Sequence, residues 1–484
     1  MGFVNNPIQA WRPIVKHSNQ GSVASQVESL QRQFAQVPGL PFADLLSAEQ
    51  ITQLLDQMGV AFRDRDYPPL VTLAMFLSQC SDADPSLKQA VARLIAQQVA
   101  DGRPASSSNT GAYSRARQRL PEKVLAELTR NTGKQLMTQA PDAWKWHGRT
   151  VKVVDGSTAS MPDTEANQKE YPQPSTQKPG LGFPMVRFVV VFALAVGTVL
   201  DAAFCPYAGK EHSELALFRR LHDGLEDGDV VLADRYFCSF FDIAELERRG
   251  VAVVMRQHQK RKTDFRRGVP IGKYDHLVPW KKPQRPDWMD EETYRQYPDE
   301  IWMRELRVHV RGLKRKIRSR TITVATTLYD HEEYTKADVA QLYRLRWQAE
   351  LNLRSLKTVM QMDVLRGKTP TMVRKEMWAH FLAYNLIRKV MCQAAKTHGL
   401  KPWKISFKGA LQTLNAFALP LLSCDRSRLQ EVIEAMLLAI ARHGVGTRPN
   451  RIEPRRVKRR PKPHKLLNTP RAKARSLEIL DSCE

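Results

Sequence analysis

Apolar residues recur at three- and four-residue spacing through the first third of the chain. Clear examples are SAEQITQLLDQMGV (47–60) and PSLKQAVARLIAQQVADG (85–102). This is the period of a helix with one buried face. After the loop signal SSSNTG, the segment AYSRARQRLPEKVLAELTRNTGKQL begins with basic residues instead. We therefore expect a helical unit over residues 25–143, preceded by a loose polar stretch at 1–24.

Near Trp144 the pattern changes from helical to strand-like. The runs RTVKVV, DVVLA and VAVVMR are short and rich in β-branched residues, and VRFVVVFALAVGTVLDAAF is typical of two strands that turn at Gly197. The segments KEHSELALFRRLHDGL and CSFFDIAELERRG have helical spacing. The resulting order is strand, strand, strand, helix, strand, helix, strand. It predicts an α/β domain around one mixed sheet, beginning with residues 144–256.

Residues 257–328 interrupt this pattern. Basic clusters and Pro-rich turns surround the strand-like segments IWMRELRVHV and RTITVATTL, which predicts an inserted β-rich subdomain with a basic surface. Residues 329–443 return to helical spacing. Residues 444–484 form a basic tail that is Pro-rich at its start, and we expect this tail to be extended and to contact phosphates.

The segment YRLRWQAELNLRSLK (343–357) contains no Pro or Gly and predicts one continuous helix. Tyr343, Arg346, Glu350 and Lys357 fall within an arc of roughly 60° at about 100° per residue. An adjoining strip is apolar and consists of Leu342, Leu345, Ala349, Leu353 and Leu356. The helix can therefore dock on a core while it presents one carboxylate, two cations and a phenol.

The net charge of +25 and the pI near 9.9 narrow the choice of partner. Such a field favours polyanions, with nucleic acid as the leading partner and an anionic membrane surface as the alternative. No stretch of the sequence approaches the twenty apolar residues of a membrane-spanning helix, and the N-terminus has no signal-peptide pattern. The six cysteines are scattered without a CxxC pair, which favours a reduced compartment and no zinc site. We expect a cytoplasmic protein.

Two predicted strands end in an aspartate, Asp155 in VVDGST and Asp234 in LADRYF. If the first and fourth strands are neighbours, both carboxylates lie at one edge of the sheet, where open α/β sheets build their sites. Together with Glu350 they would form an oxygen-only ligand set, which selects magnesium or manganese. Two such ions about 4 Å apart can activate a water or a 3′ hydroxyl and stabilise the leaving oxygen at one phosphorus.

Each of these residues alone has a commoner structural explanation. A strand-end Asp is usually a turn or cap residue, and a Glu between two cations is usually part of a surface ion pair. His212, Ser213 and Glu214 in GKEHSE are likewise better explained by a helix N-terminus than by a hydrolase site. The chemical interpretation rests on the joint pattern, in which Arg346, Lys357 and Arg235 would hold a phosphodiester. The basic face of Arg115 and Arg119 fits either a DNA groove or solvent.

The two Asp motifs and the string Y-x-x-R-x-x-x-E-x-x-x-x-x-x-K at 343–357 resemble the DDE transposases of bacterial insertion sequences, specifically the IS-four family. The resemblance covers about residues 60–465. It implies an RNase H-like catalytic core with a β-strand insertion, an N-terminal DNA-binding domain and a helical, basic C-terminal region. It also implies cut-and-paste transposition through a DNA hairpin.

By this resemblance Asp155, Asp234 and Glu350 are ligands of Mg²⁺, for which Mn²⁺ can substitute. Tyr343 and the two cations of its helix would hold phosphates and a flipped base. The partners would be double-stranded DNA, both terminal inverted repeats and target, bound by a dimer in the nucleoid. The further predicted DNA contacts are Arg235, Arg115, Arg119, Arg455, Arg456, Lys458, Arg459 and Arg460.

The resemblance has one departure. Relatives that form hairpins can stack the flipped base on a Trp of the last insertion strand, whereas TITVATTL has none. Trp280, Trp288, Trp302 and Tyr329 are the candidates to replace it. The alternative functions are a transposase-derived DNA-binding repressor, against which the intact acidic residues argue, and a nuclease that cuts without joining strands.

Overall fold

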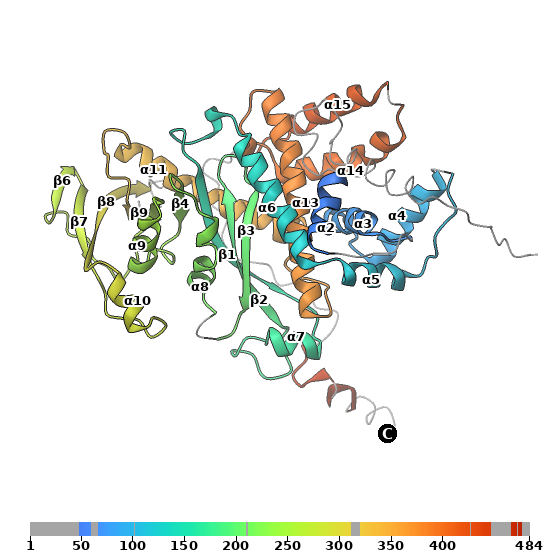
Figure 1. Ribbon diagram of the computed structural model, residues 1–484, viewed down its shortest axis with the longest axis horizontal. Helices are drawn as coiled ribbons and strands as arrows, with labels where there is room; N and C mark the ends of the chain where they lie inside the picture. Colours follow the sequence, from blue (N-terminus) through green and yellow to red (C-terminus); the bar gives the residue numbers. More distant parts are fainter. Residues whose placement is uncertain are drawn as a thin grey trace, which may run out of the picture.

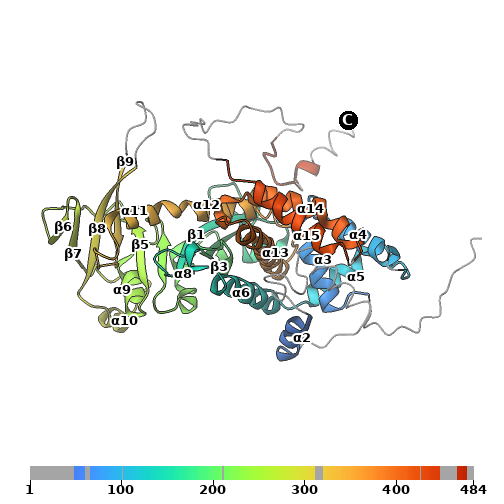
Figure 2. The same ribbon diagram turned by 90° about the horizontal axis from the view of Figure 1, so that it is seen from above.

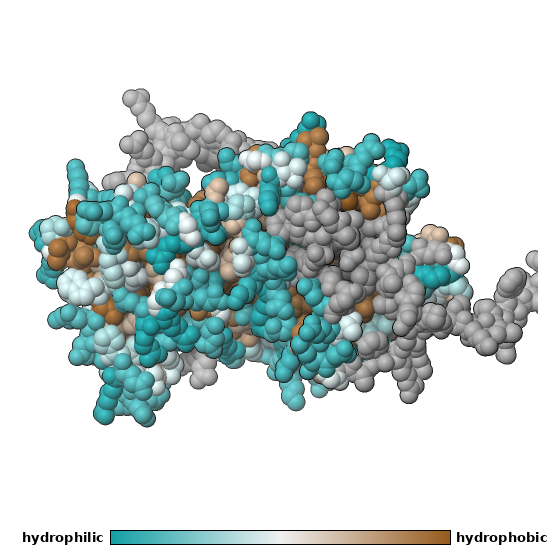
Figure 3. All heavy atoms as spheres, turned by 45° about the horizontal axis from the view of Figure 1, so that its top comes forward, coloured by the Kyte–Doolittle hydropathy of each residue, from teal (hydrophilic) through white to brown (hydrophobic). Residues whose placement is uncertain are grey.

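The computed structural model describes residues 48–59, 66–100, 102–209, 212–310, 320–425, 427–446, 466–471 and 473–476. Helices gather at one end of an elongated molecule and strands at the other (Figure 1). In the part of the chain just defined, no helix has the length and apolar character to cross a membrane. Figure 3 shows one face, on which hydrophilic residues predominate and hydrophobic ones form small separate patches.

Within the described residues, five α-helices come before the first strand. They are α2 (Ala48–Gln57), α3 (Pro69–Ser81), α4 (Leu87–Ala100), α5 (Thr110–Arg119) and α6 (Glu122–Thr138). The periodicity did not predict α3, because its residues from Val71 to Leu77 are all buried and so show no polar face. Pro121 separates α5 from α6 and precedes the first turn of the second helix, where a proline is tolerated.

One nine-stranded sheet runs through the strand-rich end. Its strands are β1 (Val151–Ser160), β2 (Met185–Ala193), β3 (Val199–Pro206), β4 (Val230–Ala233), β5 (Ala252–Arg256), β6 (Val269–Gly272), β7 (Asp275–Lys281), β8 (Glu300–Val310) and β9 (Arg320–Thr326). Their order is β3-β2-β1-β4-β5-β9-β8-β7-β6. The β1–β4 and β4–β5 pairs are parallel and the others are antiparallel. The predicted mixed α/β sheet is confirmed, and strands β6 to β8 of the predicted insertion extend the same sheet through β9.

Helices cover both faces of this sheet. The later helices are α7 (Glu165–Glu170), α8 (Glu214–Arg219), α9 (Phe240–Arg248), α10 (Glu291–Gln296), α11 (Lys336–Leu345), α12 (Trp347–Arg354), α13 (Pro370–Thr397), α14 (Phe407–Ser423) and α15 (Leu429–Arg442). Shorter turns are η1 (Asp142–Trp144), η2 (His222–Gly224), η3 (Ser355–Val359) and η4 (Pro402–Lys404). Helices α8 and α9 share a core with one face, whereas α6, α11, α12 and α13 share a core with the other.

Helix α13 joins the helical end to the sheet. It is 28 residues long and almost entirely buried between α3, α6, α14 and α15 (Figures 1 and 2). Asn385 of α13 donates a hydrogen bond to the Val199 carbonyl and accepts one from the Val199 N–H, both at 2.8 Å. The same amide also donates to the Thr129 carbonyl of α6 at 3.1 Å. Helices α2, α3 and α6 therefore share one hydrophobic core with the sheet, whereas α4 and α5 pack with α3 in a separate cluster.

Candidate active site

The two strand-end aspartates lie side by side. In the parallel pair of β1 and β4, Val153 is the partner of Leu232. Asp155 and Asp234 each follow two residues later, so they stand at the same level of neighbouring strands. Side chains alternate between the faces of a sheet, so both carboxylates point to the face that carries α11 and α12. The condition under which the sequence predicted a paired site, neighbouring first and fourth strands, is met.

Glu350 reaches the same place from above the sheet. It lies on α12, which packs against β1. The pKa of Asp155 is raised to about 6, mainly by burial. The Gly156 N–H and Arg346 oppose this rise, whereas the nearby Asp234 and Glu350 carboxylates add to it. The three carboxylates thus interact electrostatically in one half-buried site. The Oε1 atom of Glu350 accepts a hydrogen bond of 2.7 Å from Arg346 Nη2.

The residue types fit a hard divalent cation, because all the converging donors are carboxylate oxygens. Their present positions do not yet form a complete ligand set. Across the residues that the structure describes, no three His, Cys, Asp or Glu side chains come close enough together to hold a metal ion. A metal bound by all three carboxylates would require these side chains to come closer together.

The prediction of one continuous helix over 343–357 is wrong. The chain tightens at Arg346, where its N–H bonds to the Tyr343 carbonyl at 3.2 Å and its carbonyl accepts from the Ala349 N–H at 3.0 Å. The later turn η3 is π-helical and therefore wider. Lys357 lies in this wider turn and donates to Ser157 Oγ of β1 at 3.1 Å, two residues beyond Asp155. A period of 3.6 residues does not reveal either local change of pitch.

The other predicted contacts are spread over the molecule. Tyr343 is half-buried, and burial raises the pKa of its phenol. Arg235 is exposed and donates to Gln259 Oε1 at 2.9 Å. Arg115 and Arg119 are exposed on α5, which lies at the helical end of the molecule (Figures 1 and 2). The predicted contacts of the tail, which are Arg455, Arg456, Lys458, Arg459 and Arg460, lie outside the described residues.

Sequence reasoning missed the position of Glu214. The expected helix start is correct, since Ser213 Oγ accepts from the Ala216 N–H. The Glu214 carboxylate, however, lies directly against Gly156, where an added Cβ would stand 2.4 Å from its Cδ. Burial raises the pKa of Glu214, and Asp234 adds to this. Only the glycine that follows the first Asp hinted at this close approach.

Of the four aromatic side chains that were candidates to stack on a flipped base, two are engaged in hydrogen bonds and two are exposed. Trp280 is buried and donates to Glu305 at 2.7 Å, and the Tyr329 hydroxyl donates to Glu247 at 2.5 Å. Trp288 and Trp302 are about half exposed. Two further exposed aromatic residues, which were not among the predicted candidates, follow the acidic and basic residues closely in the chain: Tyr236 after Asp234, and Trp347 after Arg346.

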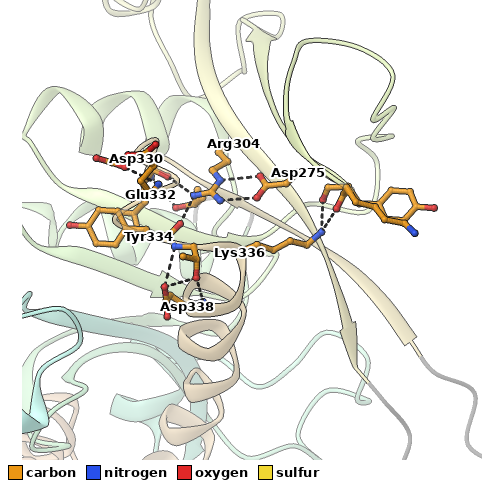
Figure 4. Close-up of polar contacts among 12 residues, drawn as sticks. Asp275, Arg304, Asp330, Glu332, Tyr334, Lys336 and Asp338 are labelled. Carbon is orange, nitrogen blue, oxygen red and sulfur yellow. Dashed lines mark hydrogen bonds and ion pairs between the residues drawn. The ribbon is translucent and has the colours of Figure 1, made fainter.

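A buried ion pair fixes the start of α11 (Figure 4). Arg304 of β8 makes two hydrogen bonds to Asp275 of β7, at 2.7 and 3.0 Å, and donates to the Tyr334 carbonyl at 2.6 Å. One residue later Thr335 begins α11 with a capping box that it forms with Asp338. The inserted hairpin therefore sets the position from which the helix of Tyr343 starts.

Comparison with known proteins matches this chain to transposases. A family model described as transposase DDE domain matches residues 146–386. The transposase InsG for insertion sequence element IS4 of Escherichia coli K12 is 27% identical over 437 residues, which cover 88% of this chain and 93% of InsG. The transposase for insertion sequence element IS421 of Escherichia coli is 38% identical over 65 residues, which cover 13% of this chain and 18% of that one. Among solved structures, a piggyBac transposase synaptic complex with hairpin DNA aligns with a TM-score of 0.41 at 8% identity, covering 85% of each chain.

Proposed function

Because this chain belongs to the IS4 family of DDE transposases of bacterial insertion sequences, we propose that it cleaves DNA at the ends of its element and joins them to target DNA by two-metal phosphoryl transfer. The observation that carries the proposal is the level pairing of Asp155 and Asp234 on neighbouring strands, with Glu350 above them. We assign strands β3-β2-β1-β4-β5 with their helices to an RNase H-like core. Strands β6–β9 are then the insertion, and the N-terminal helices are the DNA-binding domain.

In this proposal Asp155, Asp234 and Glu350 hold Mg²⁺, or Mn²⁺ in its place. The ions would supply Lewis-acid stabilisation of charge at the reacting phosphate. Asp155 is suited to a cation because its carboxylate is buried beside two like charges, which makes its ionised form unfavourable without a counterion.

Arg346 would couple DNA binding to metal binding by Glu350. Its guanidinium now pairs with Glu350. A DNA phosphate at the same place would compete for the guanidinium, because Arg binds phosphate and carboxylate through the same pair of N–H groups. The phosphate would thereby free Glu350 to serve as a metal ligand. Lys357, held near β1 by Ser157, would contact a second phosphate.

Cleavage through a hairpin needs a place for a base turned out of the helix. Trp347 and Tyr236 are exposed and adjacent in sequence to the proposed site residues, and Trp288 and Trp302 are exposed elsewhere on the molecule. Stacking on an aromatic side chain is worth about 1 to 3 kcal/mol per base. The proposed partners are terminal inverted repeats and target DNA, bound by a dimer in the bacterial cytoplasm.

The test is cleavage of a supercoiled plasmid that carries the element's own ends, in magnesium, manganese or EDTA. We expect metal-dependent double-strand release by the wild type and none by Asp155→Ala. Hairpin-capped ends would support the hairpin route. Strand-transfer products on a second plasmid would exclude a nuclease that only cuts. Tight end binding without cleavage in any metal would instead favour the transposase-derived repressor.

A further inference from the structure

The row of strand-end side chains continues past the two aspartates to Arg256. In the parallel pair of β4 and β5, Ala233 is the partner of Met255. The next residue on each strand is Asp234 or Arg256, so these two stand at the same level, one strand spacing of about 5 Å apart. On its other side Arg256 is the partner of Val324 in β9, which belongs to the core beneath α11.

Arg256 therefore points to the same face as the proposed metal ligands. Helix α11 packs against β5 and α12 against β1, so the two helices span the ends of the three parallel strands (Figure 2). The charge of Arg256 acts on the Tyr343 phenol together with that of Arg346, and both lower its pKa against the larger effect of burial. A phenol and two guanidinium groups thus lie together beside the carboxylates.

Among the described residues, the guanidinium of Arg256 is not held in an ion pair. It is half-buried, yet no carboxylate of the described residues forms an ion pair with it. Arg304 and Arg219 are paired with Asp275 and Asp242, each at 2.7 Å. Partial burial of a charge is unfavourable unless an opposite charge accompanies it. Asp234 stands one strand away but forms no ion pair with Arg256, so the guanidinium remains able to bind an anionic ligand.

We propose that Arg256 binds a phosphate of the DNA strand that lies across the Asp155, Asp234 and Glu350 carboxylates. The inference rests on the proposed function and assigns β5 a part in it. Guanidinium binds phosphate through two parallel N–H groups, which fixes direction as well as distance. Asp155 of β1 and Asp234 after β4 would then act, through the metal, on one part of the DNA strand. Arg256 of β5 would bind a neighbouring phosphate of the same DNA strand.

The experiment pairs a protein change with a DNA change. Duplexes carrying the element's end are made with one phosphate at a time near the cleavage site replaced by a neutral methylphosphonate. Binding and cleavage are measured for wild type, Arg256→Gln and Arg256→Lys. Arg249→Gln is the matched control, because Arg249 lies on the opposite face of the sheet and is already paired with Glu245 and Asp223.

We expect Arg256→Gln to weaken end binding and slow cleavage by about tenfold or more, the size of one charged hydrogen bond. At one phosphate the methylphosphonate should weaken wild-type binding about tenfold and leave Arg256→Gln unchanged. Arg256→Lys should keep part of that coupling, and Arg249→Gln should behave as wild type.

If every methylphosphonate weakens Arg256→Gln as much as wild type, Arg256 contacts no phosphate and the inference is wrong. Metal-dependent cleavage by wild type would still support the proposed function in that case. If wild type itself does not bind or cleave the ends, the proposed function is wrong. Should Arg256→Gln not fold, Arg256→Met keeps the aliphatic stem and is judged by the same criterion.

Discussion

At the residue scale, Asp155 combines a chemical role with a cost in stability. Its pKa is about 6 in the folded chain against an ordinary value of 3.8, and burial is the main cause. Between about pH 4 and 6 the folded state therefore binds more protons than the unfolded state, so stability falls as the pH rises through this window. Above about pH 6 the carboxylate is ionised in both states, and the full loss of stability of the metal-free fold has been reached.

Asp155→Asn should consequently stabilise the metal-free protein. We expect the free energy of unfolding to rise on the order of 1 to 2 kcal/mol at pH 7.5, with the difference vanishing near pH 4. Urea unfolding in EDTA at the two pH values measures it. Equal stability of both proteins at pH 7.5 would show that Asp155 is not strained by its surroundings.

The role of Glu350 can be separated from that of its neighbouring cations. Glu350→Gln removes a proposed metal ligand but no positive charge, so cleavage should fall at least about a thousandfold while DNA binding is kept. Cleavage and mobility-shift assays on the same duplex measure both. Glu434→Gln, on the exposed side of α15, is the control. Loss of DNA binding by a folded Glu350→Gln would contradict the assignment.

At the scale of elements, the ion pair between Asp275 of β7 and Arg304 of β8 holds these strands to the start of α11, since Arg304 also bonds the Tyr334 carbonyl. Both side chains are almost fully buried. Asp275→Ala would leave the guanidinium buried without its partner, which costs about 3 to 5 kcal/mol. Asp275→Ala combined with Arg304→Met should cost clearly less, because no unpaired charge remains. Denaturant unfolding of the single and double variants checks this, and additive effects would rule out the coupling.

The sequence predicted those elements whose patterns lie within a few neighbouring residues. The strand runs, the turn at Gly197 with its positive φ of 73°, and the buried strip of the helix of Glu350 all follow from periodicity or from glycine. The tight turn at Arg346 does not, because it depends on packing against the sheet. Glu214 and Arg256 were missed for a related reason. The packing of α8 on the sheet brings Glu214 beside Gly156, and the pairing of β4 with β5 brings Arg256 beside Asp234.

At the scale of the whole molecule, the net charge of +25 should dominate DNA affinity. Deleting the chain after Arg448 removes much of the basic tail. We expect weaker DNA binding and a flatter dependence of log K on log salt, by about 0.9 for each phosphate that the tail neutralises. Titrations at several salt concentrations measure the slope, and an unchanged slope would show that the tail binds no phosphates.

The burial of α13 between the N-terminal helices and the sheet also constrains how a new chain matures on the ribosome. Helix α6 ends at Thr138, but the helix that completes its core ends at Thr397. At roughly 5 to 20 residues per second, the intervening stretch of about 260 residues takes roughly 13 to 50 s to synthesise. During that interval α6 can pack on α2 and β3, but the part of α6 that contacts α13 has no final partner. A nascent chain should therefore depend on chaperones until its last third emerges, and truncated translation products should be degraded rather than accumulate as free DNA-binding fragments.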